Sequence, residues 1–215
     1  MARDFVVIFD LDGTLLNTDL LIEKSFDHVF HIYKPDYILT KEEHLSFLGP
    51  PLRDSFARYF PKEMVDELVA CYREYNHDKH EKYVTIYPTV KETLKYLKEK
   101  GYPLAVLTTK YSKAAFIGLD LFDITQYFDI VLGMDQLTNM KPHPEGIFQI
   151  MNKFQCHKAV MIGDNTSDIM AGKNANIYTI GVNWSPKGTK EIEALQPDLM
   201  IDQMSEIIDF IEGVS

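Results

Sequence analysis

Four groups of polar residues in this chain have the types and spacing to carry out chemistry. Each group comes at the carboxyl end of a predicted strand, where open α/β sheets bind ligands. Carboxylates that meet at such an edge repel one another unless a cation lies between them, and all-oxygen ligands favour Mg²⁺ over Zn²⁺. The pattern therefore predicts a magnesium site. The groups are Asp10-Leu11-Asp12-Gly13-Thr14, Thr108-Thr109-Lys110, Lys141 within Lys-Pro-His-Pro, and Gly163-Asp164-Asn165-Thr166-Ser167-Asp168.

The first group does not open a calcium-binding loop of the EF-hand type. Such a loop needs glycine at its sixth position and glutamate at its twelfth. A loop that starts at Asp10 places Leu15 and Leu21 at those positions. The chain also contains no Gly-Lys-Ser/Thr phosphate loop and no Gly-x-Gly-x-x-Gly fingerprint. Nucleotide binding by these two routes therefore has no support.

Short apolar runs predict the strands that position the four groups. Continuous apolar runs are typical of strands buried on both faces of a parallel sheet. Helical patterns lie between them, and one begins with a capping box of Thr89 and Glu92 and ends at Gly101. This alternation predicts an α/β fold with a doubly wound, mainly parallel, Rossmann-like sheet. The runs are Phe5–Phe9, Leu104–Leu107, Ile130–Leu132, Val160–Ile162 and Tyr178–Val182.

Residues 17–82 interrupt the alternation of strands and helices. They contain helical patterns and no good strand, so we expect an inserted helical cap. The α/β core then comprises residues 1–16 and 83–215. The helical patterns are Leu20–His31, Lys41–Phe47, Leu52–Tyr59 and Glu63–His80.

Composition argues against several classes of protein. The 215 residues include 22 lysines and arginines against 32 aspartates and glutamates, for a net charge of −10. Nucleic acids and anionic membranes are bound by clustered cations, so neither is an expected partner. Two cysteines do not make a secreted disulfide scaffold, and no signal-peptide pattern or membrane-spanning stretch is present. We expect a cytoplasmic protein, either a monomer or a homodimer.

In this order and at these strand ends, the four groups resemble the motifs of the haloacid dehalogenase-like phosphohydrolase superfamily. The resemblance extends over essentially the whole chain, and the helical insertion is similar to the small cap of that superfamily. It implies phosphohydrolysis through an aspartyl phosphate on Asp10, with Mg²⁺ as the cofactor. A carboxylate nucleophile eases such a reaction because it splits phosphoryl transfer into two steps.

The resemblance also assigns the metal ligands. Asp10 and Asp164 hold Mg²⁺ through their carboxylates, whereas Asp12 contributes its backbone carbonyl. Asp168 completes the metal site either directly or through a water molecule.

The remaining roles concern the phosphoryl group and the protons. We expect the Asp12 carboxyl to protonate the leaving oxygen and afterwards to deprotonate the attacking water. Thr108 and Thr109, with nearby backbone N–H groups, bind the phosphoryl oxygens. Lys141 offsets the charge that grows on those oxygens.

Two residues of the first group distinguish between activities within the superfamily. Haloacid dehalogenases expel halide, which needs no proton, and their pattern lacks the aspartate found here as Asp12. Thr14 is typical of the phosphatases, whereas β-phosphoglucomutases usually have valine there. A mutase stays a less favoured alternative, as does a non-catalytic regulator that binds phosphate.

The helical insertion contains a loop similar to the substrate loop of the superfamily, Gly49-Pro50-Pro51-Leu52-Arg53. Glycine and proline set a turn, and the guanidinium of Arg53 suits a phosphate or carboxylate. Gly49 and Arg53 are therefore predicted substrate contacts, with a helix–helix connection and a surface arginine as the alternative reading. The spacing of His77 and His80 does not by itself indicate whether they contact substrate.

The insertion as a whole is similar to that of bacterial pyrophosphatases of the superfamily, and phosphoglycolate phosphatases share much of its pattern. We therefore predict that inorganic pyrophosphate is the leading substrate, with phosphoglycolate or another small phosphomonoester as the close alternative. Trp184, in the loop after the last predicted strand, is expected to pack; a place at the entrance of the site is the alternative.

Overall fold

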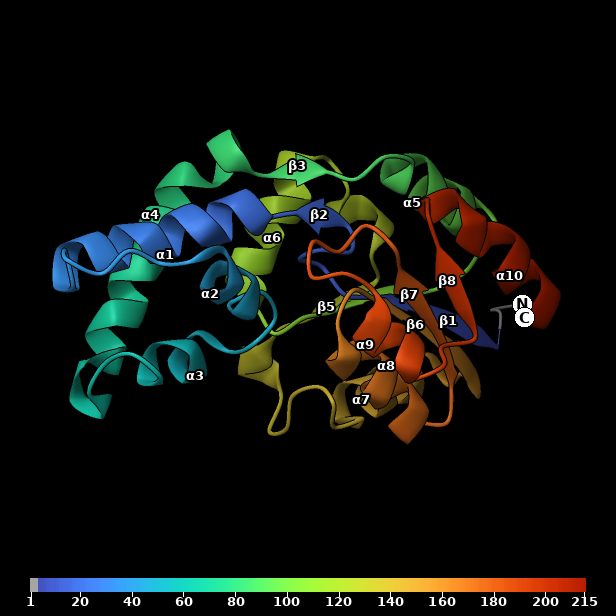
Figure 1. Ribbon diagram of the computed structural model, residues 1–215. Helices are drawn as coiled ribbons and strands as arrows, with labels where there is room; N and C mark the ends of the chain where they lie inside the picture. The colour runs from blue at the N-terminus through green and yellow to red at the C-terminus, as the bar shows by residue number, and fades with distance from the viewer. Residues whose placement is uncertain (1–3) are drawn as a thin grey trace. The chain divides into compact units, whose positions relative to one another are not determined.

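The computed structural model describes residues 4–215, which form two compact units (Figure 1). The α/β unit comprises the residues up to Leu16 together with Ile86–Ser215. The helical unit comprises Asn17–Thr85, so it ends at Thr85 and not at residue 82 as the sequence suggested. Residues 1–3 of the predicted core lie outside the described residues.

A parallel sheet forms the centre of the α/β unit. Within residues 4–215 it has six strands in the order β5-β4-β1-β6-β7-β8, and every neighbouring pair is parallel. The prediction of an α/β fold with a parallel sheet is thereby confirmed. The strands are β1 (Phe5–Phe9), β4 (Leu104–Leu107), β5 (Ile130–Leu132), β6 (Lys158–Gly163), β7 (Tyr178–Val182) and β8 (Leu199–Ile201).

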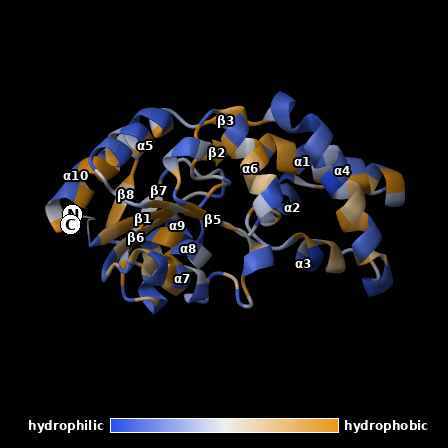
Figure 2. Ribbon diagram, turned by 180° about the vertical axis from the view of Figure 1, so that it is seen from behind, coloured by the Kyte–Doolittle hydropathy of each residue, from blue (hydrophilic) through white to orange (hydrophobic). Residues whose placement is uncertain are grey.

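Helices cover both faces of this sheet (Figure 1). On one face, Val6 and Ile8 of β1 pack in one apolar cluster with Ile147 of α7. On the other face, the ring of Phe5 packs against Tyr178, which in turn contacts Phe210 of α10. The strands thus bury apolar side chains on both faces, as a doubly wound sheet requires. In Figure 2 most of the central strands have the colour of hydrophobic residues. The helices are α5 (Val90–Glu99), α6 (Ser112–Leu121), α7 (Glu145–Phe154), α8 (Thr166–Asn174), α9 (Lys190–Ala194) and α10 (Ile207–Val214).

Helix α5 does not begin with the predicted capping box. Thr89 lies in the left-handed region with φ of 62°, and its side chain makes no bond to the first turn. Instead, the Thr89 hydroxyl accepts a hydrogen bond from the backbone N–H of Ser205 at 3.2 Å. The capping prediction was wrong because a contact distant in sequence holds this side chain. The helix ends before Gly101, which has φ of +80°.

The helical unit has an apolar core of its own. Aromatic rings dominate this core, and Phe26 stacks on Phe47 with ring centroids 3.9 Å apart. Helix α2 begins with a capping box of Thr40 and Glu43. The short strands β2 (Leu16–Asn17) and β3 (Thr85–Ile86) pair where the chain enters and leaves this unit. The helices are α1 (Asp19–Tyr33), α2 (Lys41–Ser46), α3 (Leu52–Ala57) and α4 (Val65–Tyr83), with a 3₁₀ turn at Lys62–Met64.

Among the helices of residues 4–215, none combines the length and the apolar composition that crossing a bilayer would require.

Candidate active site

The carboxyl ends of three adjacent strands bring the predicted site residues together. Strand β1 lies between β4 and β6, and these strands end just before Asp10, Thr108 and Asp164 respectively. Asp168 comes from the first turn of α8, which follows β6. Carboxylate oxygens of Asp10, Asp164 and Asp168 all lie within 4.8 Å of one another, and all three residues are buried.

Lys141 reaches into this cluster from the loop before α7. Its ammonium donates to Oδ1 of Asp10 at 2.6 Å and to the backbone carbonyl of Leu107 at 2.8 Å. Oδ1 of Asp168 also lies 2.6 Å from the same nitrogen. Only 3% of the Lys141 side chain is exposed. A buried ammonium thus links the carboxylates that follow β1 and that begin α8.

The charges in the cluster do not balance. Burial raises the pKa of Asp10 to about 7; repulsion from Asp168 adds to this, whereas Lys141 opposes it. Burial and repulsion from Asp10 likewise raise the pKa of Asp164. Burial lowers the pKa of Lys141, but the negative charges of Asp10 and Asp168 outweigh burial, so the pKa of Lys141 is raised. The cluster therefore has more carboxylate than its one ammonium can neutralise.

A divalent cation fits this donor set. When all are ionised, three buried carboxylates and one ammonium have a net charge of −2. A divalent cation would neutralise this charge. The donors of Asp10, Asp164 and Asp168 are oxygens throughout, and this ligand type suits Mg²⁺. Asp10 and Asp164 are the residues best placed to hold it.

Asp168 has contacts that bear on its predicted role as a ligand. One oxygen pairs with Lys141, and the other accepts the backbone N–H of Asn165 at 3.0 Å, which completes the capping box of α8. The side chain of Asn165 also donates to Oδ1 of Asp164 at 2.8 Å. Both oxygens of Asp168 thus have partners within the protein, and its role as a direct or a water-mediated ligand stays a prediction.

Gly13 touches the cluster with its backbone. Its φ is +83°, and a Cβ added there would lie 2.5 Å from Oδ2 of Asp164. Only glycine adopts this conformation readily while leaving room for that carboxylate. The turn after Asp12 and the carboxylate of Asp164 are therefore packed directly against each other.

We expect Gly13→Ala to weaken Mg²⁺ binding about tenfold or more, because the added methyl group would displace the carboxylate of Asp164, a predicted ligand. Isothermal titration of the protein with MgCl₂ measures the effect. Gly101→Ala is the matched control, since Gly101 has φ of +80° with no atom within 4 Å of its added Cβ. Equal losses in both variants would attribute the effect to backbone strain alone.

The second group contributes a residue whose role the sequence did not suggest. The ammonium of Lys110 donates to Oδ1 of Asp12 at 2.6 Å, while its backbone N–H donates to the hydroxyl of Thr108 at 3.1 Å. Thr108 is buried, and Thr109 is half-buried beside it. Lys110 belongs to the second group of the sequence analysis, Thr108-Thr109-Lys110. Its contact with Asp12 could not be predicted, because the two residues are far apart in the sequence.

The predicted substrate residues of the insertion lie within the helical unit. Gly49 has φ of +103°, as a turn residue there would have. Arg53 pairs with Asp66 of the same unit, and 61% of its side chain is exposed. His80 is 4% exposed in that unit, whereas His77 is exposed. The roles of Gly49 and Arg53 in binding substrate remain predictions.

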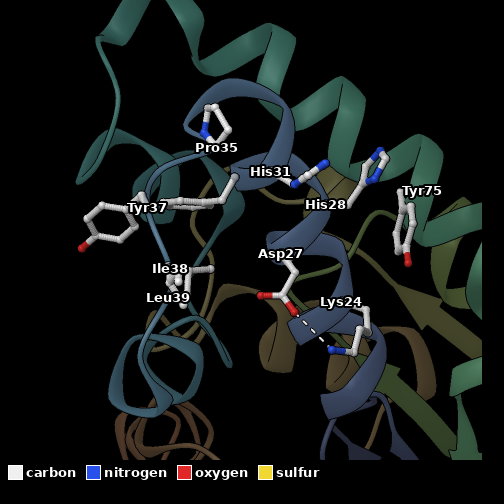
Figure 3. A pocket seen from close by; sticks show the side chains of 10 residues that line it. Lys24, Asp27, His28, His31, Pro35, Tyr37, Ile38, Leu39 and Tyr75 are labelled. Carbon is white, nitrogen blue, oxygen red and sulfur yellow. Dashed lines mark hydrogen bonds and ion pairs between the residues drawn. The ribbon is translucent and has the colours of Figure 1, made fainter.

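The helical unit also contains a cavity of about 540 Å³ beside α1 (Figure 3). Lys24, Asp27 and His28 of α1 line it together with Tyr75 of α4, and the rings of His28 and Tyr75 stack at 4.3 Å. Lys24 pairs with Asp27 at 3.2 Å, and His44 lies 2.8 Å from the other oxygen of Asp27. Lys24 and Asp27 of this cavity thus form an ion pair with each other, and neither is a predicted catalytic residue.

Comparison with known proteins gives a consistent result. The pattern of the haloacid dehalogenase-like hydrolase family matches residues 7–182. Pyrophosphatase PpaX from Bacillus thuringiensis and from Bacillus cereus is 39% identical over 211 residues, 97% of this chain and 97% of each relative.

Solved structures agree with the fold. A haloacid dehalogenase-like hydrolase from Streptococcus pneumoniae is similar with a TM-score of 0.85 at 26% identity, covering 96% of this chain and 97% of that one. A protein described as a predicted phosphoglycolate phosphatase from Haemophilus somnus has a TM-score of 0.88 at 25% identity, with 97% and 99% covered.

Proposed function

The chain belongs to the haloacid dehalogenase-like hydrolase family and is a phosphatase-type hydrolase; from this premise we propose that it hydrolyses inorganic pyrophosphate with Mg²⁺ through a phosphorylated Asp10. The observation that carries the proposal is the buried cluster of Asp10, Asp164 and Asp168 bridged by Lys141. A divalent cation would offset this excess of negative charge, and together with the ammonium of Lys141 it would supply the positive charge that binds a phosphoryl group.

In the first step, a carboxylate oxygen of Asp10 attacks one phosphorus atom of pyrophosphate. A bond from Asp10 to phosphorus forms, and the bond from that phosphorus to the bridging oxygen breaks. Asp12, in its protonated form, gives the leaving phosphate its proton. In the free protein the ammonium of Lys110 donates to Oδ1 of Asp12 at 2.6 Å and so fixes the position of that side chain.

In the second step, Asp12 removes a proton from water, and the resulting oxygen attacks the phosphorus of the aspartyl phosphate. The bond between phosphorus and the Asp10 oxygen breaks, which releases phosphate and regenerates the carboxylate. Lys141 stabilises the charge on the phosphoryl oxygens in both steps, together with Thr108 and Thr109. When bound, Mg²⁺ would draw charge from those oxygens and neutralise the carboxylates of Asp10 and Asp164.

The choice of substrate rests on the relatives and not on the α/β site. The 39% identity to proteins named pyrophosphatase PpaX extends over the insertion as well as the core, which supports pyrophosphate. The similarity to the Haemophilus somnus structure supports phosphoglycolate as the second candidate. We propose that the helical unit, Asn17–Thr85, acts as the cap that distinguishes the two, with Gly49 and Arg53 in the substrate loop.

Initial rates of phosphate release with Mg²⁺ test this choice. We expect kcat/KM for pyrophosphate to exceed that for phosphoglycolate and for a panel of sugar phosphates by about tenfold, equivalent to about 1.4 kcal/mol of transition-state binding. A preference for phosphoglycolate would contradict the proposed substrate but not the proposed mechanism. Conversion of β-glucose 1-phosphate faster than its hydrolysis would point to a mutase, and Mg²⁺-independent phosphate binding without turnover would point to a regulator.

A further inference from the structure

The loop between β7 and α9 contacts the turn at Gly13 and the residues Asp164 and Asn165 through the side chains of Trp184, Ser185 and Lys187. We infer that Trp184 in this loop is a positioning residue for the Mg²⁺ site, which it serves by holding the turn at Gly13. The inference rests on the proposed function, because it assigns a role toward the Mg²⁺ that the function requires. All of the residues concerned belong to the α/β unit.

Trp184 makes a directional contact with the turn. Its indole N–H donates to the backbone carbonyl of Gly13 at 2.9 Å. Its ring packs on Tyr87 with centroids 5.3 Å apart and planes inclined by 41°. The backbone N–H of Tyr87 donates to the carbonyl of Leu15 at 3.1 Å. The packed pair of Trp184 and Tyr87 therefore holds two carbonyls of the segment that follows Asp12.

The next residues of the loop reach the carboxylate on the other side of the turn. Ser185 is buried, and its hydroxyl donates to Oδ2 of Asp164 at 3.4 Å. The ammonium of Lys187 donates to the side-chain oxygen of Asn165, the residue that itself donates to Asp164. One loop thus contacts both Gly13 and Asp164.

The loop is itself fixed to the sheet. The backbone N–H of Asn183 donates to the carbonyl of Ile201 in β8 at 2.9 Å, and its side chain donates to Asp202 at 2.8 Å. An anchored loop is a rigid support, and rigid support of ligands raises metal affinity because less ordering is needed on binding.

The Gly13 turn and the Asp164 carboxylate are in direct contact, so their positions depend on each other. The turn also has its own backbone bond from Gly13 to Leu16 at 2.8 Å, so we expect release of the Gly13 carbonyl to loosen the turn and, with it, the position of the Asp12 carbonyl and the space left for Asp164. A hydrogen bond from Trp184 therefore preserves the spacing of proposed ligands that come from two different strands. Packing of the indole on Tyr87 without the hydrogen bond would not do this.

Trp184→Phe tests the inference, because it keeps an aromatic ring and removes the N–H. We expect the dissociation constant for Mg²⁺, measured by calorimetry without substrate, to rise about fivefold to tenfold. Tyr102→Phe is the matched control: it removes one aromatic hydroxyl, bonded to Ser215 at 2.8 Å, elsewhere in the same unit. It should leave Mg²⁺ affinity unchanged.

Because Trp184 is the one tryptophan of the chain, residue-specific replacement by benzothienylalanine changes this position alone. That residue keeps the bicyclic shape and has sulfur in place of the N–H. We expect it to weaken Mg²⁺ binding as Trp184→Phe does, and we expect the single indole ¹H–¹⁵N resonance of the unmodified protein to shift on Mg²⁺ addition.

The outcomes separate this inference from the proposed function. Unchanged Mg²⁺ affinity in the benzothienylalanine protein would reduce Trp184 to packing and overturn the inference alone. Failure of the unsubstituted protein to bind Mg²⁺ would overturn the proposed function and the inference with it. Normal Mg²⁺ binding with no hydrolysis of any phosphate would overturn the function while leaving the metal-positioning result standing.

Discussion

Replacing Asp10 with asparagine is expected to lower kcat for phosphate release by at least about 1,000-fold. An amide cannot form the covalent phosphoryl intermediate, so the two-step route is closed. The amide has nearly the same shape as the carboxylate, and its oxygen can still accept from Lys141, which now bonds Oδ1 of Asp10 at 2.6 Å. The loss should therefore be chemical and not structural.

The measurement compares single-substrate rates at saturating pyrophosphate and Mg²⁺ for Asp10→Asn and for Asp209→Asn. Asp209 is an exposed aspartate in α10, so its substitution controls for the loss of one negative charge in the same unit. Acid quenching during turnover should trap phosphate on the unsubstituted protein and none on Asp10→Asn. Turnover by Asp10→Asn within tenfold of the unsubstituted rate would exclude Asp10 as the nucleophile.

The second large effect concerns Lys141. We expect Lys141→Met to lower kcat about 100-fold, because in the proposed mechanism its ammonium offsets the charge that develops on the phosphoryl oxygens. We also expect the free energy of unfolding without Mg²⁺ to fall by about 3 kcal/mol, since removing one partner of a buried ion pair leaves charges uncompensated. Methionine keeps the linear shape of the side chain, so packing changes little.

Urea unfolding followed by circular dichroism measures the stability change, with Lys153→Met on the exposed face of α7 as the control. Added Mg²⁺ should recover part of the stability of Lys141→Met, because the cation replaces some of the missing positive charge. An unfolding free energy within about 1 kcal/mol of the unsubstituted value would instead be typical of a surface charge pair.

The strands of the α/β unit could be predicted because each is a continuous apolar run. Phe5–Phe9, Leu104–Leu107 and Tyr178–Val182 have the bounds that their hydrophobicity indicates. The edge strand Leu199–Ile201 was not predicted, since a run of three residues is too short to show a hydrophobic periodicity. Hydrogen bonding to β7 in the folded protein is what makes these three residues a strand.

The grouping of the site residues could be predicted to a similar degree. Asp10, Thr108 and Asp164 each follow an apolar run, and parallel strands end at one edge of the sheet, whereas Lys141 comes from a loop that follows β5 at a distance of several residues. The contact of Lys110 with Asp12 and that of Trp184 with Gly13 were not predictable. Each joins positions far apart in the chain, so their proximity depends on the tertiary fold and not on local spacing.

The central strand also determines the order in which the molecule can assemble. Strand β1 is synthesised first, yet its register partners are Leu104 in β4 and Lys158 in β6. Contacts so distant in sequence slow folding, whereas the helical unit closes its own aromatic core from a contiguous segment. During translation, the inserted helices are therefore expected to fold before β4 and β6, the strands that pair with β1, have been synthesised. The mutually repelling carboxylates of Asp10 and Asp164 meet only after most of the nascent chain has left the ribosome.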